Sequence, residues 1–356
     1  MVGATVDSGA LRHNLQVVRG RAPRSRVMAV VKANAYGHGL TAVAGALADA
    51  DAFAVARVEE GLALRQAGIT HPVVLLEGVF DREQLELAAH ERFELVVHSQ
   101  QQIELLRGLH SGERLRVWLK LDSGMNRLGL TGQEFTAARA ALASLPMVKQ
   151  PVGLFTHLAA ADEPGSGTTR EQLARFAAAT GNLPGARSVC NSAGLLGFSD
   201  AQADWVRPGL LLYGVSPLPG VVGADLGLRP AMTLHARVIA VKQVAAGEHV
   251  GYGGAWTAQR PTRLVIASIG YGDGYPRSLE SGAPVLVNGE RAPLAGRVSM
   301  DMIGIDATAL SKPPRVGDPV VLWGADLPVE EIAGCAGTIP YELLCGISQR
   351  VAVTLR

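Results

Sequence analysis

Cysteine is scarce in this sequence of 356 residues, which holds only Cys190, Cys335 and Cys345. An odd number at wide spacing does not make a disulfide framework, and no pair has zinc-site spacing, so we expect no metal. Charged residues are also few, at 18%, and the formal net charge of +1 argues against a nucleic-acid or anionic-membrane surface. No apolar run is long enough to span a bilayer, and the N-terminus lacks the basic start and apolar stretch of a signal peptide. We expect a soluble, cytoplasmic protein.

Apolar residues are plentiful, at 48%, and many of them gather in short runs. Eight such runs mostly alternate with patterns typical of helices, which indicates a parallel sheet that closes into a (β/α)8 barrel over residues 1–226. A doubly wound open sheet is the alternative, but no GxGxxG motif follows an early strand. The runs span residues 27–32, 51–56, 72–78, 94–99, 116–124, 151–157, 187–192 and 205–214.

The pattern changes after Leu226. Later apolar runs are short or alternating, and Gly and Pro separate them with few helical patterns in between; examples are residues 232–244, 263–274, 284–289 and 318–324. This pattern of short apolar runs and turns predicts a smaller, mainly antiparallel β domain over residues 227–356. The segment 221–232, which is rich in Gly and contains Pro230, is the expected linker.

Lys32 ends the first apolar run, and a lysine there is unusual unless its amine has a task. Desolvation would favour the neutral amine, which can attack a carbonyl and form a Schiff base, although a single lysine at a strand end is more often simply solvated. In a barrel the C-terminal strand ends form the active-site mouth. Further polar residues fall at such ends: Lys120, Asp122, His157, Asn191, Ser192 and Arg207.

Each of these residues also has a plainer interpretation. Asn191 and Ser192 precede a turn into a predicted helix, whose N-terminus could bind a phosphate, but they could equally be a helix cap. Taken alone, Arg207 fits a salt bridge at the barrel rim and His157 a buried histidine. Tyr252, in the string AGEHVGYGGAW, could be an aromatic residue packed over a turn.

Read together, the strings VVKANAYGHG, FTHLAAADE, CNSAG, WVRPGLLLYG, AGEHVGYGGAW, GRVSMDM and TIPYE resemble alanine racemases, in the expected order and over nearly the whole chain. The resemblance implies that Lys32 carries pyridoxal 5'-phosphate (PLP). It implies that Arg207 faces the pyridine nitrogen with His157 behind it, and that Tyr252 is the second acid–base residue, donated by the partner subunit of a head-to-tail homodimer. The remaining cofactor contacts would be Tyr36, Asn191, Ser192, Gly209, Leu210 and Tyr341.

The resemblance also assigns residues around the substrate. Arg127, Met300 and Asp301 would bind it, and Lys120 could be carbamylated to anchor Arg127. The entrance would be lined by Asp162, Tyr271, Arg277 and Arg297. Three positions depart modestly from the family pattern, namely Asn126, Gly272 and Ser299.

The predicted function is therefore alanine racemase, which interconverts L- and D-alanine with Lys32 and Tyr252 on opposite faces of the α-carbon and supplies D-alanine for peptidoglycan. A broader amino-acid (serine) racemase is the nearest alternative, since one hydroxyl is discriminated only modestly. A PLP-dependent decarboxylase would usually pair the pyridine nitrogen with a carboxylate, where this chain has Arg207. A single-barrel PLP-binding homeostasis protein lacks the β domain and Tyr252, and a non-catalytic homologue would not fill every catalytic position.

Overall fold

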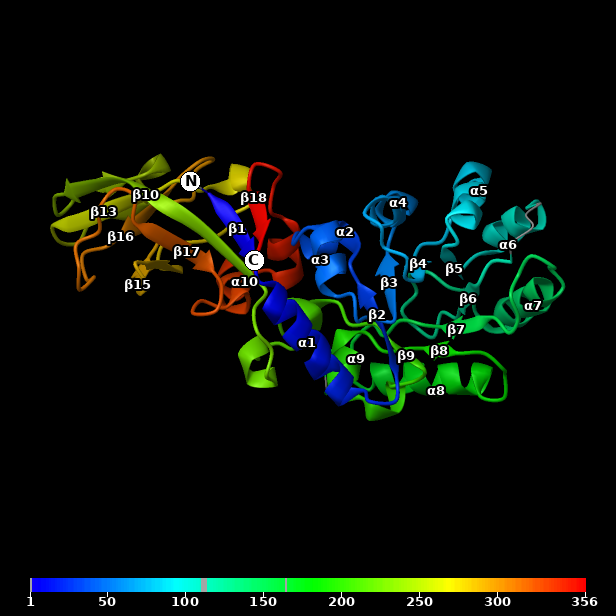
Figure 1. The fold of residues 1–356 in the computed structure, drawn as a ribbon. Coiled ribbons are helices and arrows are strands. Elements are labelled where there is room, and N and C mark those ends of the chain that lie inside the picture. The colour runs from blue at the N-terminus through cyan, green and yellow to red at the C-terminus, as the bar shows by residue number, and fades with distance from the viewer. Residues whose placement is uncertain (1, 110–113, 164) are drawn as a thin grey trace.

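The computed structural model describes residues 2–109, 114–163 and 165–356. Eight parallel strands close into a barrel, as the sequence predicts, and Figure 1 shows it beside a separate β domain. Within the described residues no helix is long and apolar enough to cross a membrane. The barrel strands are β2 (Arg26–Val30), β3 (Ala52–Val55), β4 (Val73–Leu75), β5 (Glu94–Val97), β6 (Val117–Lys120), β7 (Gly153–Phe155), β8 (Arg187–Ser188) and β9 (Trp205–Val206).

Helices cover the outside of the barrel and alternate with its strands. β9 closes the ring by pairing with β2, with Val27 opposite Val206. The run that contains β9 is shorter as a strand than its sequence indicates, because Pro208 has no N–H for a ladder bond and residues Leu210–Tyr213 form a 3-10 turn, η2. The helices are α3 (Leu40–Ala46), α4 (Val58–Gln66), α5 (Arg82–His90), α6 (Gln100–Arg107), α7 (Gly132–Ala143), α8 (Thr168–Thr180) and α9 (Ser192–Gly197).

The β domain is a mainly antiparallel eight-stranded sheet organised around the long strand β10 (Met232–Val244). Alternate side chains of the first half of β10 are buried, as expected for a strand with one covered face. The other strands are β1 (Gly3–Val6), β13 (Thr262–Ala267), β14 (Pro284–Val287), β15 (Glu290–Pro293), β16 (Ile303–Asp306), β17 (Pro319–Trp323) and β18 (Ala352–Leu355). A two-stranded ribbon, β11 (His249–Val250) with β12 (Trp256–Thr257), and helices α10 (Val329–Ala336) and α11 (Pro340–Cys345) complete it.

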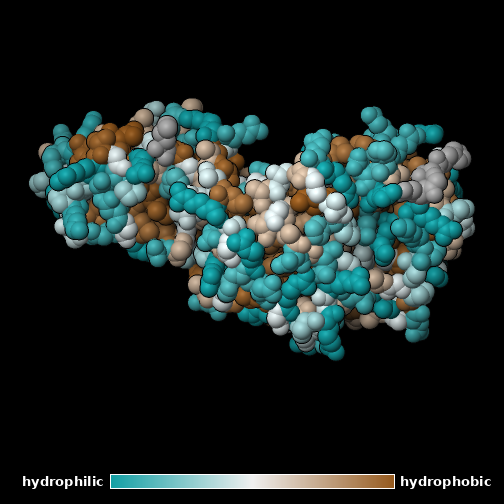
Figure 2. Space-filling view, in the orientation of Figure 1, coloured by the Kyte–Doolittle hydropathy of each residue, from teal (hydrophilic) through white to brown (hydrophobic). Residues whose placement is uncertain are grey.

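The first strand lies in this second sheet. The division at 226/227 groups residues 1–226 with the barrel, whereas β1 pairs with β10 and, in parallel, with β18. Helix α1 (Ser8–Arg21) then runs from the β domain to the barrel (Figure 1). The chain therefore joins the two domains twice, once through α1 and once through the connection between β9 and β10. In the space-filling view a notch separates the two lobes along one edge (Figure 2).

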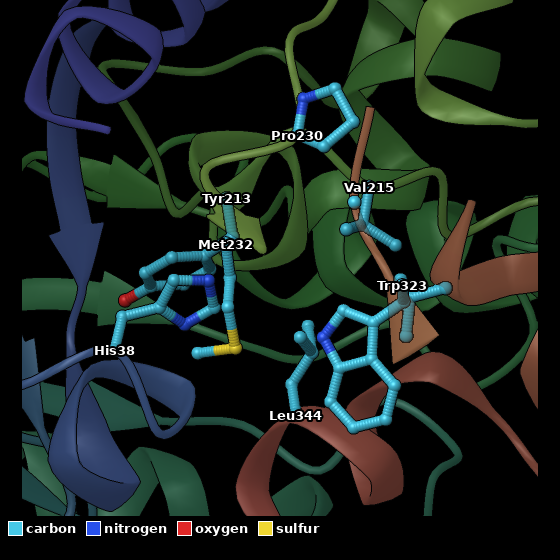
Figure 3. A pocket seen from close by; sticks show the side chains of 9 residues that line it. His38, Tyr213, Val215, Pro230, Met232, Trp323 and Leu344 are labelled. Carbon is cyan, nitrogen blue, oxygen red and sulfur yellow. The ribbon is translucent and has the colours of Figure 1, made fainter. Parts of the chain in front are cut away.

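The junction between the lobes is packed around His38, which is 1% exposed. Figure 3 shows His38 and Tyr213 from the barrel facing a small cavity that Trp323 and Leu344 of the β domain also line. The Nδ1 of His38 lies 2.8 Å from the Tyr36 carbonyl oxygen and 3.1 Å from that of Ala35, so Nδ1 carries the proton and donates. Burial lowers the pKa of His38 to about 4, so the ring is neutral at physiological pH.

We expect this histidine to make the fold sensitive to acid. Below about pH 6.5 the unfolded chain binds a proton at His38 that the folded chain does not bind until about pH 4, so the free energy of unfolding falls as pH falls through this window. At pH 5 the loss from His38 is about 2 kcal/mol. Urea unfolding at pH 7 and pH 5 should show a wild-type decrease that is larger than that of His38→Asn by this amount. Equal decreases in the free energy of unfolding of both proteins would contradict this role of His38.

Candidate active site

The C-terminal ends of the barrel strands, closed on one side by α11, surround a cavity of about 660 Å³. Its lining brings together most of the barrel residues that the sequence singles out: Lys32, Tyr36, Lys120, Arg127, His157, Asn191, Ser192, Arg207 and Gly209, with Tyr341 from α11. Leu210 is fully buried immediately after Gly209. Asp162, Tyr252, Tyr271, Arg277, Arg297, Met300 and Asp301 do not line this cavity in the single chain.

Lys32 begins an unusual turn, labelled α2 (Lys32–Tyr36). The four residues after it have φ between 52° and 54°, the left-handed helical region, although none is glycine. Such conformations cost about 1–2 kcal/mol per residue and persist only where surrounding contacts hold them. Tyr36 is held between Tyr213 and Tyr341, with ring centroids 4.9 Å and 5.8 Å away. The turn places both Lys32 and Tyr36 in the lining of the cavity.

Arg207 is 3% exposed and is held by several contacts. Its guanidinium donates to Ser188 Oγ and the Thr156 carbonyl oxygen, both at 2.7 Å, and lies over the Phe155 ring, 3.9 Å from its centroid. No carboxylate in the described part of the chain forms an ion pair with it. Burial lowers the pKa of Arg207 to about 9, which still leaves a cation at neutral pH.

Burial and nearby positive charge lower the pKa values of both His157 and Lys120. Burial first, and then Arg207 and Lys120, lower the pKa of His157 well below its usual value, so its ring is neutral. Arg207 can only donate, so the His157 Nδ1, 3.4 Å from Nη2, accepts and the ring proton lies on Nε2. Burial, followed by Arg207 and Arg127, lowers the pKa of Lys120 to about 8, which increases its neutral fraction near pH 7.

Part of the cavity lining offers hydrogen-bond donors that suit a phosphate group. Gly209 donates its N–H to Ser192 Oγ at 2.9 Å, which leaves the serine hydroxyl proton free to donate. A Cβ at Gly209 would overlap the Tyr36 hydroxyl, so the glycine lets that ring approach the backbone. No described residue makes a hydrogen bond to the Tyr36 hydroxyl, and burial strongly raises its pKa, so it stays a protonated donor. Asn191 caps α9 through the Gly194 N–H, as one of its two interpretations predicts.

Replacing Gly209 with alanine should weaken phosphate binding selectively. Its φ of −116° lies outside the left-handed region, and the added methyl group would meet the Tyr36 hydroxyl and displace it. Overpacking of this kind typically costs about 1–3 kcal/mol, and we expect the affinity for PLP, the cofactor that the sequence resemblance implies, to fall by about tenfold or more. Equilibrium titration with PLP would measure the change. Gly45→Ala, where the new methyl group meets nothing within 4 Å, is the matched control and should bind PLP as the wild type does.

Several cavity residues were not anticipated from the sequence. Phe155 packs against Arg207, and its ring centroid lies 6.0 Å from Lys120 Nζ. The only sequence signal for Phe155 is the alternation in FTH, since residues two apart in an extended segment point to the same side, and His157 follows the end of β7. Glu77, Ile339 and Cys345 also line the cavity. Burial raises the pKa of the Cys345 thiol, and the nearby Lys32 opposes this.

The β-domain candidates form a second, separate group. Tyr252, in the 3-10 turn η4 (Tyr252–Gly254), is 68% exposed. Close to it, Arg277 and Arg297 line a cavity of about 560 Å³. Tyr271, in η5 (Tyr271–Asp273), donates its N–H to Ser299, beside the exposed Met300. Asp301 pairs with Arg350 at 2.7 Å. One chain thus presents two groups of site residues that do not meet in one cavity.

Comparison with known proteins decides the family. The family model for the alanine racemase N-terminal domain matches residues 6–217, and that for the C-terminal domain matches residues 231–355. The chain belongs to the alanine racemase family. An alanine racemase of Nitrosococcus oceani is 53% identical over 354 residues, which are 99% of this chain and 98% of that protein. As a member of this family the chain is a racemase, an isomerase that acts on alanine.

Solved alanine racemases share the whole fold. The biosynthetic alanine racemase from Pseudomonas aeruginosa superposes with a TM-score of 0.95 at 46% identity, covering 100% of this chain and 98% of that one. The alanine racemase from Bartonella henselae, solved with covalently bound pyridoxal phosphate, gives a TM-score of 0.89 at 32% identity, covering 100% and 99%. The barrel followed by a mainly antiparallel β domain is therefore the alanine racemase architecture.

Proposed function

We propose that this chain racemises alanine with PLP held on Lys32, using Lys32 and Tyr252 of the partner subunit on opposite faces of the α-carbon. The observation that carries the proposal is the cavity that joins Lys32 to a buried Arg207 without a carboxylate partner. When bound, PLP withdraws electrons from the amino acid attached to it and makes its α-proton acidic. The chain's own residues must bind, orient and exchange that proton.

Lys32 has two tasks in this scheme. Its Nζ would hold the cofactor through the aldehyde carbon. Once the substrate is bound, the same amine would take or return the α-proton on one face. The phosphate would be held by Tyr36, Ser192, Gly209, Leu210 and Tyr341. Burial raises the pKa of Tyr341 to about 12, which keeps it a donor.

Arg207 would donate a hydrogen bond to the pyridine nitrogen and keep its own proton, and so leave the ring nitrogen unprotonated. This pairing would weaken the electron withdrawal that PLP supplies and favour return of the proton to the same carbon. His157 accepts from Arg207 and orients it. This pairing favours racemisation over decarboxylation, for which a carboxylate partner would be expected.

The substrate carboxylate is bound by Arg127 and by the backbone N–H of Met300, with Asp301 beside it. We infer that Lys120 is carbamylated, because its lowered pKa supplies the neutral amine that reacts with CO2. The resulting anion would attract Arg127. A gain of one carboxyl group at Lys120 in the intact mass of gently ionised protein would support this, and an unmodified lysine in bicarbonate buffer would exclude it.

A homodimer with shared sites would unite the two groups of residues. The exposed Tyr252, Tyr271 and Met300 form a surface that a partner barrel could cover, and Asp162, Arg277 and Arg297 would line the approach. We assign the enzyme to the cytoplasm and to the supply of D-alanine for peptidoglycan. The comparison protein from Pseudomonas aeruginosa, which is described as biosynthetic, favours that role.

The deciding experiment incubates PLP-loaded protein with L-alanine in deuterated water and follows optical rotation and α-deuterium together. We expect rotation to fall to zero while deuterium enters the α-position. A PLP absorbance band with neither change would refute the proposal. The same assay with L-serine separates a narrow from a broad racemase by the ratio of the two kcat/KM values.

A further inference from the structure

The left-handed turn after Lys32 is tied to the neighbouring strand–helix loop by one carboxylate. The backbone N–H of Ala33 donates to Glu60 Oε1 at 2.6 Å. The other oxygen, Oε2, accepts from the N–H groups of Ala56 at 2.8 Å and Arg57 at 3.2 Å. Glu60 thus joins the residue after Lys32, through Oε1, to the start of α4, through Oε2.

The far end of the turn is held locally. His38 Nδ1 donates to the carbonyl oxygens of Ala35 and Tyr36, and Asn34 Oδ1 accepts the N–H of Leu40 at 2.9 Å. At the near end, the peptide that joins Lys32 to Ala33 is fixed by Glu60, which comes from another element. The direction of this peptide sets where the Lys32 side chain leaves the backbone, so the carboxylate acts next to the catalytic amine.

We propose that Glu60 is a positioning residue for Lys32, an inference that rests on the proposed role of Lys32. Capping the start of α4 uses Oε2 alone, so the bond from Oε1 to Ala33 serves the turn. Glu60 forms no ion pair with Lys32 among the described residues, so it acts through the backbone and leaves the amine free for the cofactor.

The test is Glu60→Gln, which keeps the size of the side chain but leaves a single accepting oxygen. Both sets of bonds cannot form, because the amide nitrogen cannot accept. Two N–H groups lie at Oε2 and one at Oε1, so the remaining oxygen should stay at the start of α4 and the bond to Ala33 should be lost. We expect kcat for alanine to fall by about 10²-fold with little change in KM, since a small misplacement of a catalytic group has effects of this size. In cofactor-free protein, the Ala33 amide should lose its protection from hydrogen exchange. The pH midpoint of the lysine-bound PLP absorbance should also shift.

Two control variants separate positioning from stability. Glu59→Gln changes the exposed neighbouring carboxylate and should match the wild type in every measurement. Leu64→Ala removes a fully buried side chain of the same helix, so it should lower stability while keeping kcat and Ala33 protection. If Glu60→Gln does not accumulate, Glu60→Asp, which keeps the charge but is one methylene shorter, takes its place with the same expectations.

The outcomes are distinct. Unchanged kcat and Ala33 protection in Glu60→Gln would overturn the inference, as would equal losses of kcat in Leu64→Ala. If the wild type binds PLP at Lys32 without racemising alanine, the proposed function fails, and Ala33 exchange and the absorbance midpoint still decide the role of Glu60.

Discussion

A Lys32→Ala variant is expected to lose at least about 10⁴-fold in kcat for alanine racemisation, because one substitution removes both the attachment point of the cofactor and an acid–base group. The absorbance band of lysine-bound PLP should be absent. Noncovalent PLP binding should survive in weakened form, since Tyr36, Ser192 and the glycine at 209 are unchanged. Steady-state kinetics and a visible spectrum measure both effects.

The lost amine can in part be replaced from solution. Alanine at position 32 leaves additional space in the cavity, so methylamine should restore some racemisation to Lys32→Ala. Lys242→Ala, at an exposed position of β10, is the control and should retain full activity and the normal band. An unchanged spectrum in Lys32→Ala would show that another residue holds the cofactor.

The barrel could be predicted because its strands are apolar runs at regular intervals, and the position of Lys32 followed from one of them. The conformation after Lys32 could not. Ala33 and Ala35 have no local preference for φ near 53°, and the carboxylate of Glu60, which comes from another element of the fold, helps to hold the turn there. β1 shows the same limit, since nothing local in Gly3–Val6 selects β10 and β18 as its neighbours.

Site residues could be predicted from the sequence where they are of a type that is rare at buried strand ends. They could not be predicted where they are of a common type. Arg207 and His157 stand out among apolar residues at strand ends, and the structure brings them within 3.4 Å. Phe155 is one apolar residue among many, and its place under Arg207 needs the folded chain. Glu60 resembles any exposed glutamate at the start of a helix, and only its distance to the Ala33 N–H reveals a second task.

Tyr252→Phe is expected to lower kcat by about 10²–10⁴-fold while PLP still binds to Lys32. The ring is 68% exposed in the single chain, so loss of its hydroxyl should change the free energy of unfolding by no more than about 0.5 kcal/mol. With an acid–base group on one face only, one enantiomer of alanine should exchange its α-proton for deuterium without inversion, and the other should not exchange. Tyr271→Phe, in the same domain, is the control and should exchange the α-proton of both enantiomers for deuterium. Equal exchange of both enantiomers by Tyr252→Phe would remove its catalytic role.

Mixing the two inactive variants tests whether the tyrosine acts across the dimer. In a hybrid of Lys32→Ala and Tyr252→Phe chains, shared sites would place the intact Lys32 of one chain opposite the intact Tyr252 of the other. One site per hybrid would then be complete, and random exchange of subunits should restore about one quarter of wild-type activity. If Tyr252 served its own chain, every site in the mixture would lack one of the two groups, and no activity would return. The recovered fraction therefore reports which subunit supplies the second proton-transfer group, independently of any structure of the dimer.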